Sequence, residues 1–148
     1  MTFHVDSEVG RLHQVIVHKP GLELSRLTPS NVDGLLFDDV LWASRAREEH
    51  HAFVEQLRDK GVKVHYFGDL LAQTLTIPEA RAFVLDRVVN DHTVGPTLVE
   101  PVRELAQAID SEALASFLIG GILKRDLQLP ESHRASLLWQ HLEEEDFV

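Results

Sequence analysis

Residues 19–41 read KPGLELSRLTPSNVDGLLFDDVL, and this stretch decides the fold. It begins where an apolar strand pattern stops and ends where a helical pattern starts. Connections inside a compact α/β unit usually span roughly two to six residues, and much longer loops are usually functional or disordered. Pro20, Pro29 and Asn31 supply turn chemistry, and apolar residues in the stretch need burial, so we expect an ordered loop.

Two interpretations of this loop follow from composition, and both stay open. One is a loop packed over the carboxyl end of a strand, where α/β proteins place ligand sites. The other is a structural loop that buries its own Leu35-Leu36-Phe37 patch. Arg26 could bind a carboxylate through its planar guanidinium, although a single arginine is not a motif.

The flanking segments predict strand, long loop, helix and strand. Residues 12–18 carry a β-branched apolar run, which is typical of a strand buried on both faces. Residues 62–67 alternate between apolar and polar side chains and predict a second strand. If the two strands share one sheet, we expect them to be parallel and joined by a right-handed crossover.

Between them, residues 41–60 predict a helix. Asp38 or Asp39 is placed to cap its first turn, and Gly61 is placed to end it in a left-handed conformation. Its predicted apolar face consists of Ala46, His50, Phe53 and Leu57.

Beyond Leu75 the apolar period changes from two to about 3.6, which predicts helices only. The order Thr76-Ile77-Pro78-Glu79 is typical of a capping box, Ser111 is placed to cap a later helix, and Gly120-Gly121 to end it. We therefore expect an α/β unit over residues 1–73 and a helical region over residues 74–148, with the boundary near Gln73. The predicted helical positions are Ala80, Phe83, Val84, Arg87 and Val88, then Leu98, Val102, Leu105 and Ile109, then Leu114, Phe117 and Leu118, and finally Ala135, Leu138, His141 and Leu142.

Composition excludes several classes of function. The chain has no cysteine, so it holds no disulfide, thiolate metal site or cysteine nucleophile. Its net charge of −10 argues against nucleic acid or an anionic membrane as partner. No apolar run reaches the ~20 residues of a membrane span, and the first residues do not resemble a signal peptide. We therefore expect a cytoplasmic protein that binds neither membrane nor nucleic acid.

No motif indicates catalysis or a metal. Glu48 and His51 have the Glu-x-x-His spacing of carboxylate-bridged metal sites, but such sites need a second copy that the chain lacks. We expect these two side chains to form a solvated helix face, and we expect no metal and no other cofactor. A nucleophile elbow, a phosphate loop and a dinucleotide fingerprint are also missing.

Several segments, taken in order, resemble the arginine deiminases. They are residues 7–12 (SEVGRL), 15–21 (VIVHKPG), 26–31 (RLTPSN), 35–42 (LLFDDVLW), 46–53 (AREEHHAF) and 118–121 (LIGG). The resemblance implies a hydrolase that converts L-arginine to L-citrulline and ammonia without a metal or organic cofactor. It also implies a five-bladed α/β propeller, of which this chain would be the first module and the helical insertion.

In that family a cysteine attacks the guanidinium carbon, a histidine moves protons and paired carboxylates hold the guanidinium. The segments that carry those groups, including Asn-x-x-Phe-x-Arg-Asp, have no counterpart in these 148 residues. The chain alone is therefore expected to be inactive. The resemblance assigns Leu41 to the wall of the arginine pocket, with Leu36, Phe37 and Asp39 beside it in the same motif.

The chain ends in the apolar pair Phe147-Val148, which suggests a longer protein. A lone propeller module would expose strand edges and apolar faces, so we expect a homo-oligomer. The alternative is a self-standing, non-catalytic binding or oligomerisation module derived from the family.

Overall fold

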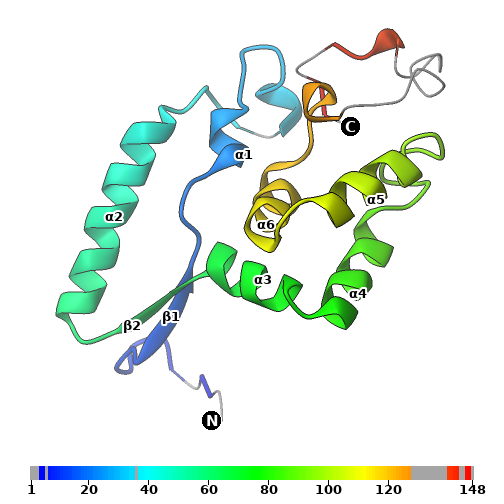
Figure 1. Cartoon of the computed structure of the whole chain (residues 1–148). Helices are drawn as coiled ribbons and strands as arrows, with labels where there is room; N and C mark the ends of the chain where they lie inside the picture. Colours follow the sequence, from blue (N-terminus) through cyan, green and yellow to red (C-terminus); the bar gives the residue numbers. More distant parts are fainter. Residues whose placement is uncertain (1–3, 6, 36, 128–139, 144–145, 148) are drawn as a thin grey trace.

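The computed structural model describes residues 4–5, 7–35, 37–127, 140–143 and 146–147. A pair of parallel strands, β1 (Gln14–Val17) and β2 (Lys63–Tyr66), separates one long helix from a group of shorter helices (Figure 1). None of the helices in these ranges is both long and apolar enough to cross a membrane.

The predicted order of strand, long loop, helix and strand is confirmed. Val15 pairs with Val64 and Val17 with Tyr66 in a parallel register, and the chain between the strands contains α2 (Ala43–Asp59). Within the long loop lie the short helix α1 (Leu22–Ser25) and the 3-10 turn η1 (Asp33–Leu35). The loop is thus ordered, as its turn residues predicted.

The expectation that β1 is buried on both faces is wrong. The parallel register places Val15 and Val17 on one face and Ile16 on the other, and Ile16 is 60% exposed. α2 covers the face that carries Tyr66, whose ring centroid lies 6.0 Å from that of His50. Among the described residues, β1 has a single neighbouring strand and no element covers Ile16. One face of the apolar strand is therefore exposed to solvent.

The start of α2 differs from the prediction. Trp42 occupies the N-cap position without a side-chain hydrogen bond, so neither Asp38 nor Asp39 caps the helix. The Oδ1 atom of Asp39 instead accepts from the N–H of Val40 at 2.7 Å. An acidic residue shortly before a helix can accept a hydrogen bond from an adjacent backbone N–H and is then not available to cap the helix. Asp39 makes this local hydrogen bond.

The buried face of α2 is also shifted by one residue. Val54 is fully buried, whereas the predicted Phe53 is 53% exposed. Ala46, His50 and Leu57 are half-buried as predicted. Helical spacing allowed either residue, because positions 53 and 54 both follow His50 by about one turn.

Gly61 ends α2 as predicted. Its φ of +76° lies in the left-handed region. The N–H of Gly61 donates to the carbonyl of Arg58 at 2.8 Å, and that of Val62 donates to Leu57 at 3.1 Å. These two bonds form a Schellman motif, which turns the chain directly into β2.

The helical region begins earlier than expected. α3 (Phe67–Leu75) follows β2 without a loop, so Phe67 is helical and Gln73 lies inside a helix. Residues 67–75 pack against α6 (Ser111–Gly120). The helix α3 was not predicted, because the alternation in the residues just before it is typical of a strand. Behind α3 come α4 (Pro78–Val88), α5 (Val99–Ala108), α6 (Ser111–Gly120) and the turn η2 (Lys124–Asp126).

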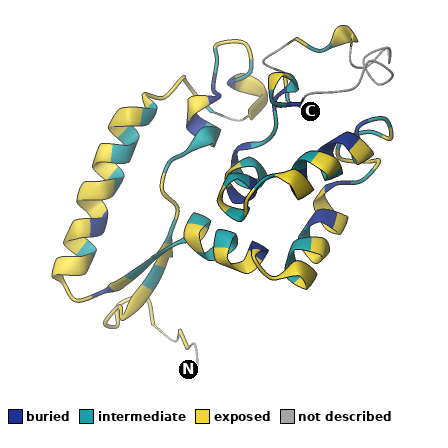
Figure 2. Cartoon of the chain, in the orientation of Figure 1, coloured by how far each residue is buried: buried dark blue, intermediate teal, exposed yellow. Residues whose placement is uncertain are grey.

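These helices enclose the main core. The buried side chains gather between them, while α2 is mostly exposed (Figure 2). The structure buries Leu85 on α4 and Val89 directly after it. The predicted Phe83, Arg87 and Val88 are exposed, whereas the predicted Ala80 and Val84 are half-buried, so the expected face is only partly right. The core residues are Leu75, Leu85, Val89, Leu98, Val102, Ala106, Leu114, Ala115 and Leu127.

The caps of these helices differ in detail from the prediction. Ile77 is the N-cap of α4 and Pro78 its first residue, whereas Thr76 Oγ1 donates to the carbonyl of Gln73 at 2.7 Å, so no capping box forms. Asp110, not Ser111, caps α6 through a 2.8 Å bond from the N–H of Ala113. Gly120-Gly121 ends α6 as predicted. Of the last predicted helix, Ala135 and Leu138 lie outside the described residues.

Candidate functional site

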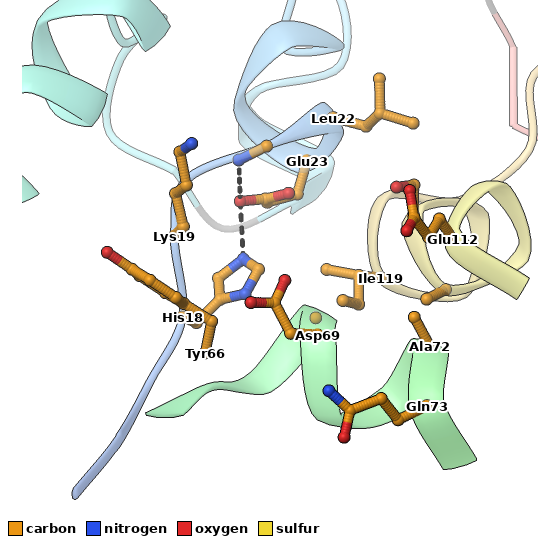
Figure 3. A pocket seen from close by; sticks show the side chains of 14 residues that line it. His18, Lys19, Leu22, Glu23, Tyr66, Asp69, Ala72, Gln73, Glu112 and Ile119 are labelled. Carbon is orange, nitrogen blue, oxygen red and sulfur yellow. Dashed lines mark hydrogen bonds and ion pairs between the residues drawn. The ribbon is translucent and has the colours of Figure 1, made fainter. Parts of the chain in front are cut away.

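A cavity of about 630 Å³ lies where the carboxyl ends of the two strands meet α3 and α6. Parallel sheets place their ligand sites at this end of the strands. Figure 3 shows side chains from the end of β1, the long loop, α3 and α6 around it. The lining residues are His18, Lys19, Gly21, Leu22, Glu23, Tyr66, Gly68, Asp69, Ala72, Gln73, Glu112, Ala115, Ser116 and Ile119.

A histidine–carboxylate pair occupies one wall. The Nε2 atom of His18 lies 2.8 Å from Oε1 of Glu23, and the same oxygen accepts from the N–H of Gly21 at 2.7 Å. Partial burial of Glu23 acts to raise the pKa of its carboxyl, but the hydrogen bonds from Gly21 and His18 outweigh it, and the pKa lies below the ordinary value. Glu23 is therefore ionised and fixes the His18 ring at the end of β1.

The cavity carries more negative than positive charge. Glu23, Asp69 and Glu112 contribute carboxylates from the loop, α3 and α6, and Lys19 contributes an ammonium group. In Figure 3, Asp69 points toward His18, while Glu112 lies on the opposite side of the cavity. Such a lining suits a ligand with a cationic group. Among the described residues no histidine–carboxylate cluster is arranged to hold a metal ion.

The described residues that the sequence assigned to a pocket wall, Phe37, Asp39 and Leu41, do not line this cavity. Leu41 is 45% exposed, Asp39 is exposed and Phe37 is half-buried, all in the segment that connects η1 to α2. Leu36 lies outside the described residues. Their predicted role in the wall of an arginine pocket is therefore still a prediction.

Sequence reasoning missed the residues that do line the cavity. His18 and Lys19 could have been found, because they follow directly after a predicted strand. Asp69 could not, because the helix that carries it was not predicted. Glu112 belongs to α6, which only tertiary packing brings against the strands.

The long loop buries apolar side chains outside the expected patch, of which the described Phe37 is half-buried. Leu24, Leu27 and Val32 are buried, whereas Leu35 is 40% exposed. Asn31 holds the turn, because its Oδ1 accepts from the N–H of Thr28 at 2.8 Å and its Nδ2 donates to the carbonyl of Arg26 at 2.9 Å.

Arg26 binds partners within the chain and is not presented to a ligand. Its side chain is buried, and Nη2 lies 2.6 Å from Oδ2 of Asp126. Its Nη1 donates to the carbonyls of Gly120, at 3.1 Å, and Gly121. The guanidinium also lies over the ring of Phe117. Arg26 thus ties the loop to the end of α6 and to η2.

A family model described as arginine deiminase matches residues 33–148. The chain belongs to the arginine deiminase family. The matched part runs from η1 through α2, β2 and the whole helical region, so it includes Asp69 and Glu112 of the cavity. The parallel strand pair and the helices that follow agree with the α/β architecture that the resemblance implied.

Proposed function

We propose that this chain supplies the first α/β module and the helical insertion of an arginine deiminase, which hydrolyses L-arginine to L-citrulline and ammonia. The family match over residues 33–148 carries this proposal. The strand–loop–helix–strand unit followed by helices supports it. In the assembled propeller, this proposal keeps the division between module and insertion near Gln73, within α3, and makes the segment with Leu36, Phe37, Asp39 and Leu41 part of the arginine pocket wall.

The 148-residue chain by itself performs no hydrolysis in this proposal. Attack on a guanidinium carbon requires a strong nucleophile, which the family supplies as a cysteine thiolate. The chain has no cysteine. Its part in the reaction is to build and shape the pocket that holds arginine.

A reconstitution experiment tests the proposal. The chain is co-expressed with an arginine deiminase from which the corresponding amino-terminal residues have been deleted, and citrulline is measured. We expect citrulline only when both parts are present. Citrulline from the purified chain alone, or an inactive mixture in which the two parts demonstrably associate, would contradict the proposal.

The role of Leu41 is tested in the same mixture by Leu41→Asp. Val40→Asp is the matched control, because Val40 is the preceding residue and is 41% exposed against 45% for Leu41. We expect Leu41→Asp to raise the KM for arginine about tenfold or more, since a carboxylate would replace an apolar pocket wall. Equal changes in KM for the two substitutions would show that Leu41 does not line the arginine pocket.

A homo-oligomeric binding module is the second candidate function. Ile16 on the uncovered sheet face is 60% exposed, and Leu12 before β1 is 47% exposed. In this candidate, strand edges and this face pair with a second copy. Sedimentation of the isolated chain at micromolar concentration tests it, since a monomer throughout would exclude such pairing.

A further inference from the structure

A second, smaller cavity shares Lys19 and Tyr66 with the first one and extends against α2. Its volume is about 290 Å³. In Figure 3, Lys19 and Tyr66 stand on the border of the first cavity, on the side away from Glu112 and Ala72. The lining residues are Lys19, Arg47, Glu48, His50, His51 and Tyr66.

The charge of this cavity is opposite to that of the protein. The chain carries 24 acidic against 14 basic residues, yet four of these six lining side chains are lysine, arginine or histidine. Glu48, the one carboxylate, is engaged by Arg45 Nη1 at 3.3 Å. With Lys19 and Arg47 against a single, already engaged carboxylate among the described lining residues, the lining suits an anionic ligand.

The cations of the cavity lack carboxylate partners. No carboxylate of the described residues forms an ion pair with Lys19 or Arg47, and Arg47 is half-buried. Other arginines of the chain do have such partners, namely Arg26, Arg45, Arg58 and Arg103. A half-buried guanidinium without an anion carries a desolvation cost that an anionic ligand would remove.

The other donors of the cavity point to the same chemistry. Burial lowers the pKa of His50, and the positive groups of His18, Lys19 and His51 lower it further. The negative charge of an anion in the cavity would oppose both effects by stabilising the imidazolium. The ring of His50 lies beside that of Tyr66, whose hydroxyl adds another hydrogen-bond donor to the lining.

We propose that this cavity binds a small phosphate-type oxyanion, with Arg47 and Lys19 supplying charge and His50, His51 and Tyr66 supplying hydrogen bonds. The guanidinium fork of Arg47 matches two oxygens of such an anion. The site lies at the carboxyl ends of the parallel strands. It is independent of arginine hydrolysis, because none of its lining residues has been given a role in that reaction.

The test is a calorimetric titration of the full chain with inorganic phosphate at constant ionic strength. We expect saturable binding and a rise in Tm with phosphate concentration. Arg47→Gln and Lys19→Gln each weaken binding about tenfold, which is the usual effect of losing one charge-assisted hydrogen bond. Both should keep the wild-type circular dichroism spectrum, because neither side chain has a structural ion pair.

Arg11→Gln and Lys63→Gln are the matched controls. Each removes the same charge from an exposed position, and neither residue lines either of the two cavities described above, since Arg11 precedes β1 and Lys63 begins β2. We expect the controls to bind within about twofold of wild type, because distant exposed charges are screened. Absence of saturable binding up to millimolar phosphate would overturn the proposal, and so would an equal loss in the control variants.

A parallel titration with glycerol 3-phosphate identifies the source of the anion. Tighter binding than inorganic phosphate would support a phosphate ester as the ligand, and equal or weaker binding would support free phosphate.

Discussion

Replacing Arg26 by methionine keeps an unbranched side chain at this buried position and removes its guanidinium. The variant loses the 2.6 Å ion pair with Asp126 and the bonds to the carbonyls of Gly120 and Gly121. Hydrogen bonds from charged groups contribute about 1.5–3 kcal/mol each, and breaking one partner of a buried pair costs about 3–5 kcal/mol. The Asp126 side chain is one-fifth exposed, and its carboxylate still accepts from the N–H of Leu123. The expected loss of stability therefore lies at the lower end of the range for breaking a buried pair.

We therefore expect Arg26→Met to lower the free energy of unfolding by about 3 kcal/mol and Tm by about 6–12 °C. Urea unfolding, monitored by circular dichroism, measures the free energy of unfolding. Arg45→Met is the matched control, because its ion pair with Glu49 has a similar distance of 2.8 Å but its side chain is 57% exposed. An exposed pair contributes about 0.2–1 kcal/mol, so the control should lose less than about 1 kcal/mol.

A double-mutant cycle with Asp126→Asn isolates the pair. We expect a coupling energy of at least about 1.5 kcal/mol between Arg26 and Asp126, since both are in one hydrogen-bonded network. A coupling below about 0.5 kcal/mol, or an equal loss in the Arg45→Met control, would refute the assignment of Arg26 as the tie between the loop and α6.

Three further outcomes are expected. Gly61→Ala should lower the free energy of unfolding by about 1 kcal/mol in urea titrations, because φ is +76° while a Cβ would meet only Nη2 of Arg11, in ordinary contact at 4.0 Å. Gly120→Ala should cost about 2 kcal/mol or more and lower Tm, because a Cβ would overlap the Leu22 side chain and lie 3.1 Å from the backbone nitrogen of Glu23. Because the pKa of Glu23 is lowered on folding, its ionised form stabilises the fold above the ordinary pKa of about 4.3. The stability advantage of wild type over Glu23→Gln should therefore be complete above about pH 5 and disappear as the pH falls below about 4; an advantage that grew on acidification would contradict the sign.

Local signals predicted the parts of the fold that depend on the backbone within a few residues. The apolar runs marked both strands, Gly61 marked the end of α2, and Pro78 marked the start of α4. These signals act through neighbouring hydrogen bonds and allowed dihedral angles, so they need no distant partner. Caps were less certain, because Asp39 and Thr76 had local acceptors and donors that competed with the helix ends.

The amino-acid sequence by itself determined the strand–loop–helix–strand order, the helical region and, through its ordered segments, the family. Only the tertiary structure decided which partner Arg26 takes, because Asp126 lies 100 residues away along the chain. The same holds for the cavity, whose Glu23, Asp69 and Glu112 come from three separate elements. Periodicity tells which face of an element is apolar, but the element that covers this face, and the charges that meet beside it, depend on long-range packing.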